Sequence, residues 1–168
     1  GGDVGARNAS LSIMAGGDEA VINVLYPLFN CMAKTVAWMG RAGNGQQTKM
    51  ANQLAVAGTM IGVCEALVYA GRAGVDLKQL VSVISKGAAG CWTLENLAPR
   101  IILGDNAPGL MVDHFVKDLG IALQESEQLG IRLPGLELAS RLYKQLQQAG
   151  HGQSGTQALI HAISQLSD

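Results

Sequence analysis

Three polar side chains lie close together at the start of a largely apolar stretch of the sequence, shortly after a glycine-rich turn. Lys49, Asn52 and Gln53 stand in "GNGQQTKMANQLAVAG", and at about 100° per residue they share one face of a helix. The positive end of a helix dipole disfavours a charged lysine, and burial acts in the same direction. Such a lysine can exchange a proton with a substrate that a neighbouring amide orients. From the residues alone, a lysine that merely reaches solvent explains the pattern equally well.

The same turn matches two phosphate-binding motifs only in part. Gly43 and Gly45 follow a predicted strand at 35–39, as in the G-x-G-x-x-G loop of dinucleotide-binding folds, but Thr48 replaces the third glycine. A P-loop requires lysine directly after its second glycine, and here that residue is Gln46. We therefore expect no complete phosphate loop at this turn.

The first part of the chain carries a β-α-β pattern. Residues 9–16 and 35–39 are typical of strands, and Asp18 is suited to cap the helix between them. Pro27 predicts a kink or a restart in that helix. Two strands and one helix cover a sheet poorly, so residues 1–42 are interpreted as the remnant of a larger nucleotide-binding domain.

From residue 45 onward the sequence predicts about six helices and no strand. Apolar residues recur every three or four positions between residues 50 and 70, and most other positions there are also small or apolar. This helix is expected to be buried on nearly all sides. The predicted helices cover residues 50–70, 77–85, 91–103, 113–130, 134–148 and 156–167. The predicted fold is therefore mainly α, with a helical domain at 43–168.

Composition limits the classes of function. The net charge is −1 and no run of lysine or arginine occurs, which argues against nucleic-acid binding. Cys31, Cys64 and Cys91 have no metal-binding spacing, which predicts reduced thiols in the cytoplasm and no metal site. Glu65 interrupts the stretch 54–70 and leaves an unbroken apolar run of 11 residues before it. A membrane span needs roughly 20 residues, so a core helix and no membrane are expected.

Three motifs, in order along the chain, resemble signatures of the β-hydroxyacid dehydrogenases. They read "GGDVGARNASLSIMAGGDEAV", "GRAGNGQQTKMANQ" and "HFVKDLGIAL", and the resemblance covers nearly the whole chain. The family includes 3-hydroxyisobutyrate dehydrogenase and tartronate semialdehyde reductase, relatives of 6-phosphogluconate dehydrogenase. The resemblance implies a helical bundle of the 6-phosphogluconate dehydrogenase C-terminal type, preceded by the end of a Rossmann domain that binds NAD or NADP.

The resemblance also implies roles for individual residues. Lys49 matches the catalytic acid or base. The residues expected to bind the substrate are Gly1, Gly2, Asn52, Gln53 and Trp92. The residues expected to lie near the cofactor are Lys117, Asp118, Gly43 and Gly45. Some relatives carry asparagine where Gln53 stands, so the branch of substrates stays open.

Activity and assembly follow from the same resemblance. The expected reaction is hydride transfer between NAD or NADP and a small carboxylate-bearing β-hydroxyacid or its semialdehyde, in a homo-oligomer (dimer or tetramer). The main cofactor loop is expected outside this chain, so the isolated chain is expected to be inactive, and NAD and NADP cannot be separated. The alternative is a helical oligomerisation or interaction module without catalysis, which the long apolar helix favours.

Overall fold

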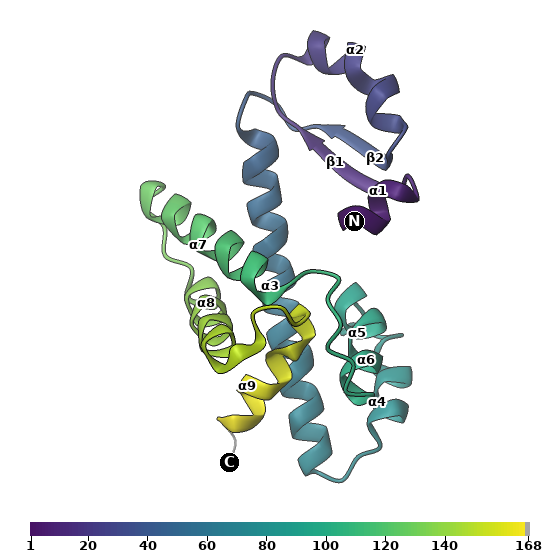
Figure 1. Ribbon diagram of the computed structural model, residues 1–168, viewed down its shortest axis with the longest axis vertical. Coiled ribbons are helices and arrows are strands. Elements are labelled where there is room, and N and C mark those ends of the chain that lie inside the picture. Colours follow the sequence, from purple (N-terminus) through teal and green to yellow (C-terminus); the bar gives the residue numbers. More distant parts are fainter. Residues whose placement is uncertain (167–168) are drawn as a thin grey trace. The chain divides into compact units, whose positions relative to one another are not determined.

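The computed structural model describes residues 1–166, with only the backbone at Asp3 (Figure 1). Its contacts divide the chain after Asn52. We call residues 1–52 the β-α-β unit and the residues from Gln53 onward the helical unit. The long helix α3 (Asn44–Arg72) continues through this division without a break.

The β-α-β unit contains two parallel strands. Its elements are α1 (Gly2–Arg7), β1 (Leu11–Ala15), α2 (Glu19–Asn30) and β2 (Ala33–Trp38). Leu11 lies opposite Ala33 and Ala15 opposite Trp38, which confirms the predicted β-α-β order. The short helix α1 was not predicted, because its two glycines and single large apolar residue form no helical pattern.

The start of α2 follows the predicted capping chemistry. The Asp18 carboxylate accepts hydrogen bonds from the backbone N–H groups of Ala20 (2.9 Å) and Val21 (3.1 Å). The helix does not restart at Pro27, since α2 continues to Asn30, and the alternative of a kink stays a prediction. Proline removes one N–H donor there, in the last turn, where few further helical bonds depend on it.

The helical unit confirms the mainly α prediction. After α3 it contains α4 (Leu77–Ile84), α5 (Trp92–Asn96), α6 (Ala98–Ile102), α7 (Val112–Gln128), α8 (Pro134–Leu146), a π-helical turn (Gln147–His151), a 3₁₀ turn (Thr156–Ala158) and α9 (Leu159–Gln165). The predicted helix 91–103 is two helices, because it breaks at Leu97 before Pro99, which lacks an N–H donor. Residue 167 of the last predicted helix lies outside the described residues.

One face of α3 forms the spine of the helical unit, while the other is open to solvent. The buried side chains include Ala57, Met60, Cys64 and Leu67. The exposed positions include Ala55, Gly58, Gly62, Glu65 and Tyr69. The expectation of burial on nearly all sides is therefore wrong in this chain, because the neighbouring helices cover only one face.

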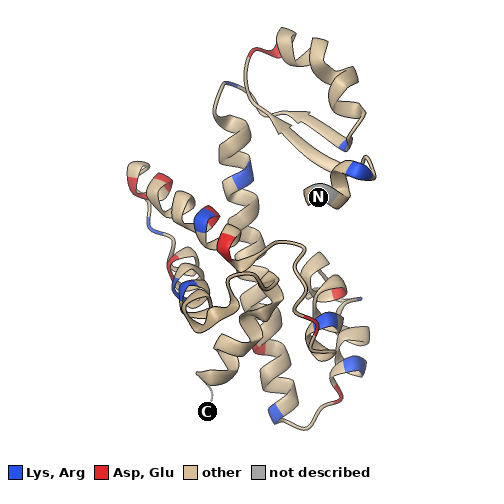
Figure 2. Ribbon diagram, in the orientation of Figure 1, with Lys and Arg blue, Asp and Glu red and all other residues tan. Residues whose placement is uncertain are grey.

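The helix α3 is long and apolar enough to cross a membrane, a property that core helices of soluble proteins share. About a third (33%) of its most apolar window is buried inside the described structure. Lysine and arginine are distributed over many elements rather than gathered on one (Figure 2).

An aromatic pair packs α7 against α8. The rings of Phe115 and Tyr143 meet edge to face, with centroids 4.8 Å apart, and both side chains are fully buried. The Tyr143 hydroxyl donates to the carbonyl oxygen of Thr156 at 2.9 Å, so its buried polar end has a partner. Burial raises the pKa of this hydroxyl well above its usual value.

The segment after α8 holds the start of α7. Backbone N–H groups of Val112 and Asp113 donate to the carbonyl oxygens of Ser154 and Gly152, each at 2.9 Å. The two Asp113 carboxylate oxygens accept from the side-chain amides of Gln147 and Gln153, each at 2.7 Å. We call these contacts the Asp113 clamp, and they fix where α7 begins.

The buried thiol of Cys64 makes the stability sensitive to alkali. Burial raises the pKa of this thiol from 9.0 to about 12, so the unfolded chain loses the proton first as the pH rises. The free energy of unfolding should be constant with respect to this group below about pH 9 and should then fall by about 1.4 kcal/mol per pH unit. Urea denaturation between pH 8 and pH 11 measures this slope. Cys64→Ala should make the slope shallower, and an unchanged slope would contradict the assignment.

The Asp113 clamp leaves no room for a side chain at position 152. Gly152 has ordinary helical dihedral angles (φ −55°, ψ −38°), but a Cβ there would collide with the Asp113 carboxylate. We expect Gly152→Ala to lower the free energy of unfolding by about 1–3 kcal/mol in urea denaturation. The matched control is Gly120→Ala in α7, where nothing lies within 4 Å of the added Cβ, and it should raise stability by up to about 1 kcal/mol. Equal effects of the two substitutions would refute the clamp.

Candidate functional site

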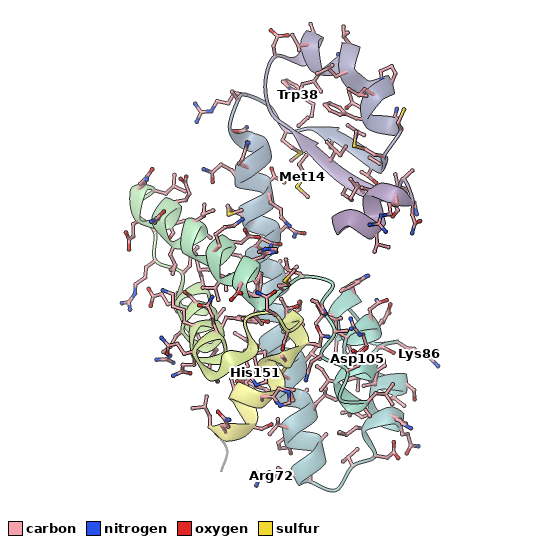
Figure 3. All side chains as sticks on the ribbon, viewed as in Figure 1. Met14, Trp38, Arg72, Lys86, Asp105 and His151 are labelled. Carbon is pink, nitrogen blue, oxygen red and sulfur yellow. The ribbon has the colours of Figure 1, made fainter. Side chains whose placement is uncertain are left out.

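The turn before α3 requires glycine for two different reasons. Gly43 has φ +92°, a conformation that side chains rarely adopt. A Cβ at Gly45 would collide with the carbonyl oxygen of Met14 and would lie 3.2 Å from the backbone nitrogen of Gly16. The first turn of α3 therefore lies directly against the end of β1, where Figure 3 labels Met14. Contact of these glycines with a cofactor stays a prediction.

The three polar residues of the opening motif differ in exposure. Lys49 and Asn52 are exposed, whereas the Gln53 side chain is only 2% exposed. Because α3 is continuous, Lys49 lies one turn before Gln53 on the same helix face. Lys49 is therefore accessible from solvent, whereas Gln53 is not.

Gln53 joins α3 to α7 within the helical unit. Its side-chain amide donates to Oδ2 of Asp118 at 2.8 Å. The other carboxylate oxygen of Asp118, Oδ1, lies 3.2 Å from the Lys117 ammonium. We call these three residues the Gln53–Asp118–Lys117 chain. The structure thus brings together one residue that the sequence analysis expected at the substrate and two that it expected at the cofactor.

Of the two charged groups in the Gln53–Asp118–Lys117 chain, the Lys117 ammonium is the more accessible to solvent. The Lys117 side chain is 67% exposed, and the Asp118 side chain only 14%. The amide of Gln53 therefore reaches a carboxylate that is largely removed from water, and that carboxylate pairs with an ammonium that water reaches. An exposed ammonium is a donor that fits the phosphate or hydroxyl oxygens of a nucleotide cofactor.

Trp92 is not one of the Gln53–Asp118–Lys117 residues and lies at the start of α5. Its side chain is 67% exposed, and the helix behind it is anchored by the Thr93 hydroxyl, which lies 2.9 Å from that of Thr59 on α3. The Cys91 sulfur caps the helix by accepting from the backbone N–H of Leu94 at 3.4 Å. The Thr59–Thr93 contact was not predicted, since its only signal in the sequence is a hydroxyl at helical spacing within an apolar run.

Gly1 and Gly2 stand at the beginning of α1. The Gly1 carbonyl oxygen accepts from the backbone N–H of Gly5 at 2.7 Å, and a Cβ at Gly1 would collide with the Leu11 side chain. Gly2 has φ +56°, which favours glycine. These contacts explain the two glycines by local packing, and their expected contact with a substrate carboxylate stays a prediction.

Two family models match the chain in sequence order. Residues 43–163 match the model described as NAD-binding of NADP-dependent 3-hydroxyisobutyrate dehydrogenase. Residues 1–40 match the NAD binding domain of 6-phosphogluconate dehydrogenase.

Individual relatives agree with these models. The chain is 49% identical over its whole length to the probable 3-hydroxyisobutyrate dehydrogenase-like 1 of Arabidopsis thaliana and covers 50% of that protein. It is 37% identical to the 2-hydroxy-3-oxopropionate reductase of Escherichia coli, with 97% of this chain and 56% of the relative covered.

A solved structure shows the same fold. The 3-hydroxyisobutyrate dehydrogenase of Mycobacterium tuberculosis with L-serine is 30% identical and has a TM-score of 0.90, with 97% of this chain and 58% of the relative covered. The chain thus spans about half the length of the relatives that it matches.

Proposed function

Because this chain belongs to the β-hydroxyacid dehydrogenase family, we propose that it serves in an oxidoreductase of small β-hydroxyacids. The enzyme would transfer a hydride between NAD or NADP and the carbon that bears the substrate hydroxyl. The observation that carries the proposal is the single face of α3, on which Lys49, Asn52 and Gln53 follow one another at helical spacing. The two family models and the exposed Lys117 ammonium support the cofactor class.

In this proposal Lys49 is the general acid or base. When an aldehyde is reduced, the Lys49 ammonium donates a proton to the carbonyl oxygen while the carbonyl carbon receives the hydride. When a hydroxyacid is oxidised, the neutral amine of Lys49 accepts the hydroxyl proton. The Asn52 amide, one turn along the helix, orients that oxygen toward the amine. NAD or NADP supplies or accepts the hydride.

The proposed substrate class is supported by the small molecules that the names of two relatives contain. The reductase of Escherichia coli is named for 2-hydroxy-3-oxopropionate, and the Mycobacterium tuberculosis enzyme is solved with L-serine. Both molecules are small and carry a carboxylate with an oxygen on the β carbon. We assign the carboxylate to the backbone N–H groups of Gly1 and Gly2. The exposed indole of Trp92 is assigned to the wall that limits substrate size.

Self-association is a second role for the same chain. The exposed face of α3 carries Ala55, Gly58 and Gly62 beside Glu65 and Tyr69, and small residues allow a second helix to approach closely. This face favours a homo-oligomer (dimer or tetramer), and it is also the observation behind the alternative, a helical association module without catalysis. The two roles are compatible in one enzyme, so catalysis must be tested directly.

Substitution of Lys49 in a full-length enzyme that carries this chain separates these functions. Lys49→Ala should lower turnover of L-serine or 3-hydroxyisobutyrate by roughly 10²- to 10⁴-fold, because a general acid or base contributes about that much. Circular dichroism should show an unchanged fold, since Lys49 is exposed. The rate is measured as NAD(P)H absorbance.

Lys78→Ala provides the control, because Lys78 is an exposed lysine in the first turn of α4, and it should leave turnover unchanged. Wild-type turnover in Lys49→Ala would favour the association module instead.

A further inference from the structure

We infer that Gln53 is a positioning residue for the cofactor side of the site, and that it acts through Asp118 on Lys117. This inference rests on the proposed function, which places Lys117 near the cofactor. The resemblance alone would place Gln53 at the substrate. The structure instead turns its amide into the helical unit, against a carboxylate 65 residues further along the chain.

Burial argues against a substrate contact by Gln53. Its side chain is 2% exposed, whereas Asn52 beside it on the same helix is exposed. The Gln53 amide nitrogen already donates at 2.8 Å to Oδ2 of Asp118, a good distance for a bond to a charged acceptor. This bond commits one N–H of the amide to a charged acceptor, and such a bond is stronger than a bond between neutral groups.

The two oxygens of Asp118 have different partners. Oδ2 accepts from Gln53, and Oδ1 faces the Lys117 ammonium at 3.2 Å. A lysine that is 67% exposed gains little order from an ion pair alone, because solvent screens the pair and the long side chain stays mobile. The Gln53 amide fixes the rotation of the carboxylate, so Oδ1 stays turned toward the ammonium.

The Gln53 side chain is uncharged, and this property is as important for the pairing of Asp118 with Lys117 as the length of the side chain. A lysine or arginine at position 53 would neutralise Asp118 and release Lys117, whereas an amide donates a hydrogen bond and leaves the negative charge in place. The bond also ties α3, which carries Lys49, to α7, which carries Lys117. The helix of the proposed acid or base is thereby held to the helix of the proposed cofactor lysine.

Cofactor binding without substrate tests the inference. In the full-length enzyme, Gln53→Met removes the donor while keeping side-chain length. We expect the Kd for the preferred cofactor, NADH or NADPH, to rise roughly 3- to 10-fold by nicotinamide fluorescence, as for residues coupled in one hydrogen-bond network. The KM for L-serine at saturating cofactor should change less than about 2-fold. Gln79→Met, at an exposed glutamine of α4, should leave the Kd unchanged.

A double-mutant cycle separates positioning from a general loss of structure. Lys117→Ala should itself weaken cofactor binding, and adding Gln53→Met to it should produce no further loss. A glutamine that only supported the fold would weaken binding equally with or without Lys117. Additive losses, or a rise confined to the KM of the substrate, would overturn the inference.

Two further outcomes keep the inference distinct from the proposed function. If Gln53→Met fails to fold, Asp118→Asn replaces it, because asparagine keeps the shape of the carboxylate and removes the charge that holds Lys117. The same Kd increase is expected, and Asp118→Asn should likewise have no further effect in the Lys117→Ala background.

A wild-type enzyme that binds cofactor but turns over no β-hydroxyacid would refute the proposed function only. Unchanged cofactor binding in the variants, with turnover intact, would refute this inference only.

Discussion

Burial of one face of α3 is the constraint on which the helical unit depends. Met60, Cys64 and Leu67 are nearly inaccessible to solvent on this face. Apolar burial of this kind dominates the stability of small domains, so the face fixes the rotation of α3 about its axis. Once the rotation of α3 is fixed, the helical spacing also fixes the direction in which the Gln53 side chain points. Lys49 lies one turn before Gln53 on the same helix. The core of the helical unit therefore sets the direction of the Gln53 side chain.

Hydrogen bonds to carboxylates add the precision that apolar packing lacks. Apolar contacts are non-directional, whereas Asp113 and Asp118 each use both oxygens with defined partners. Asp113 fixes the first turn of α7, and Asp118, five residues later, fixes that helix against α3. Lys117 stands between these two points, so its backbone is held on both sides while its ammonium remains accessible.

The proposed chemistry needs little from the chain beyond this placement. Hydride transfer takes its reactive carbon from the nicotinamide, so the protein has to hold two reactants and move one proton. The proposed substrate class, a carboxylate with an oxygen on the β carbon, rests on the resemblance to named relatives. The particular contribution of this chain is a glutamine that joins the two helices. In the proposed active site, the Gln53–Asp118 bond connects the helix of the acid or base to the helix of the cofactor lysine.

The sequence by itself determined the features that depend on residues close together along the chain. Asp18 caps α2, as its local chemistry predicts, and the structure confirms the β-α-β order that was predicted from the hydrophobic periodicity. The family was recognisable because its motifs are short and contiguous. Tertiary structure decided the exposed face of α3, since the sequence shows apolar residues without showing which neighbours cover them. It also decided the partner of Gln53, because no local pattern relates a glutamine to Asp118, 65 residues away, until two helices pack against each other.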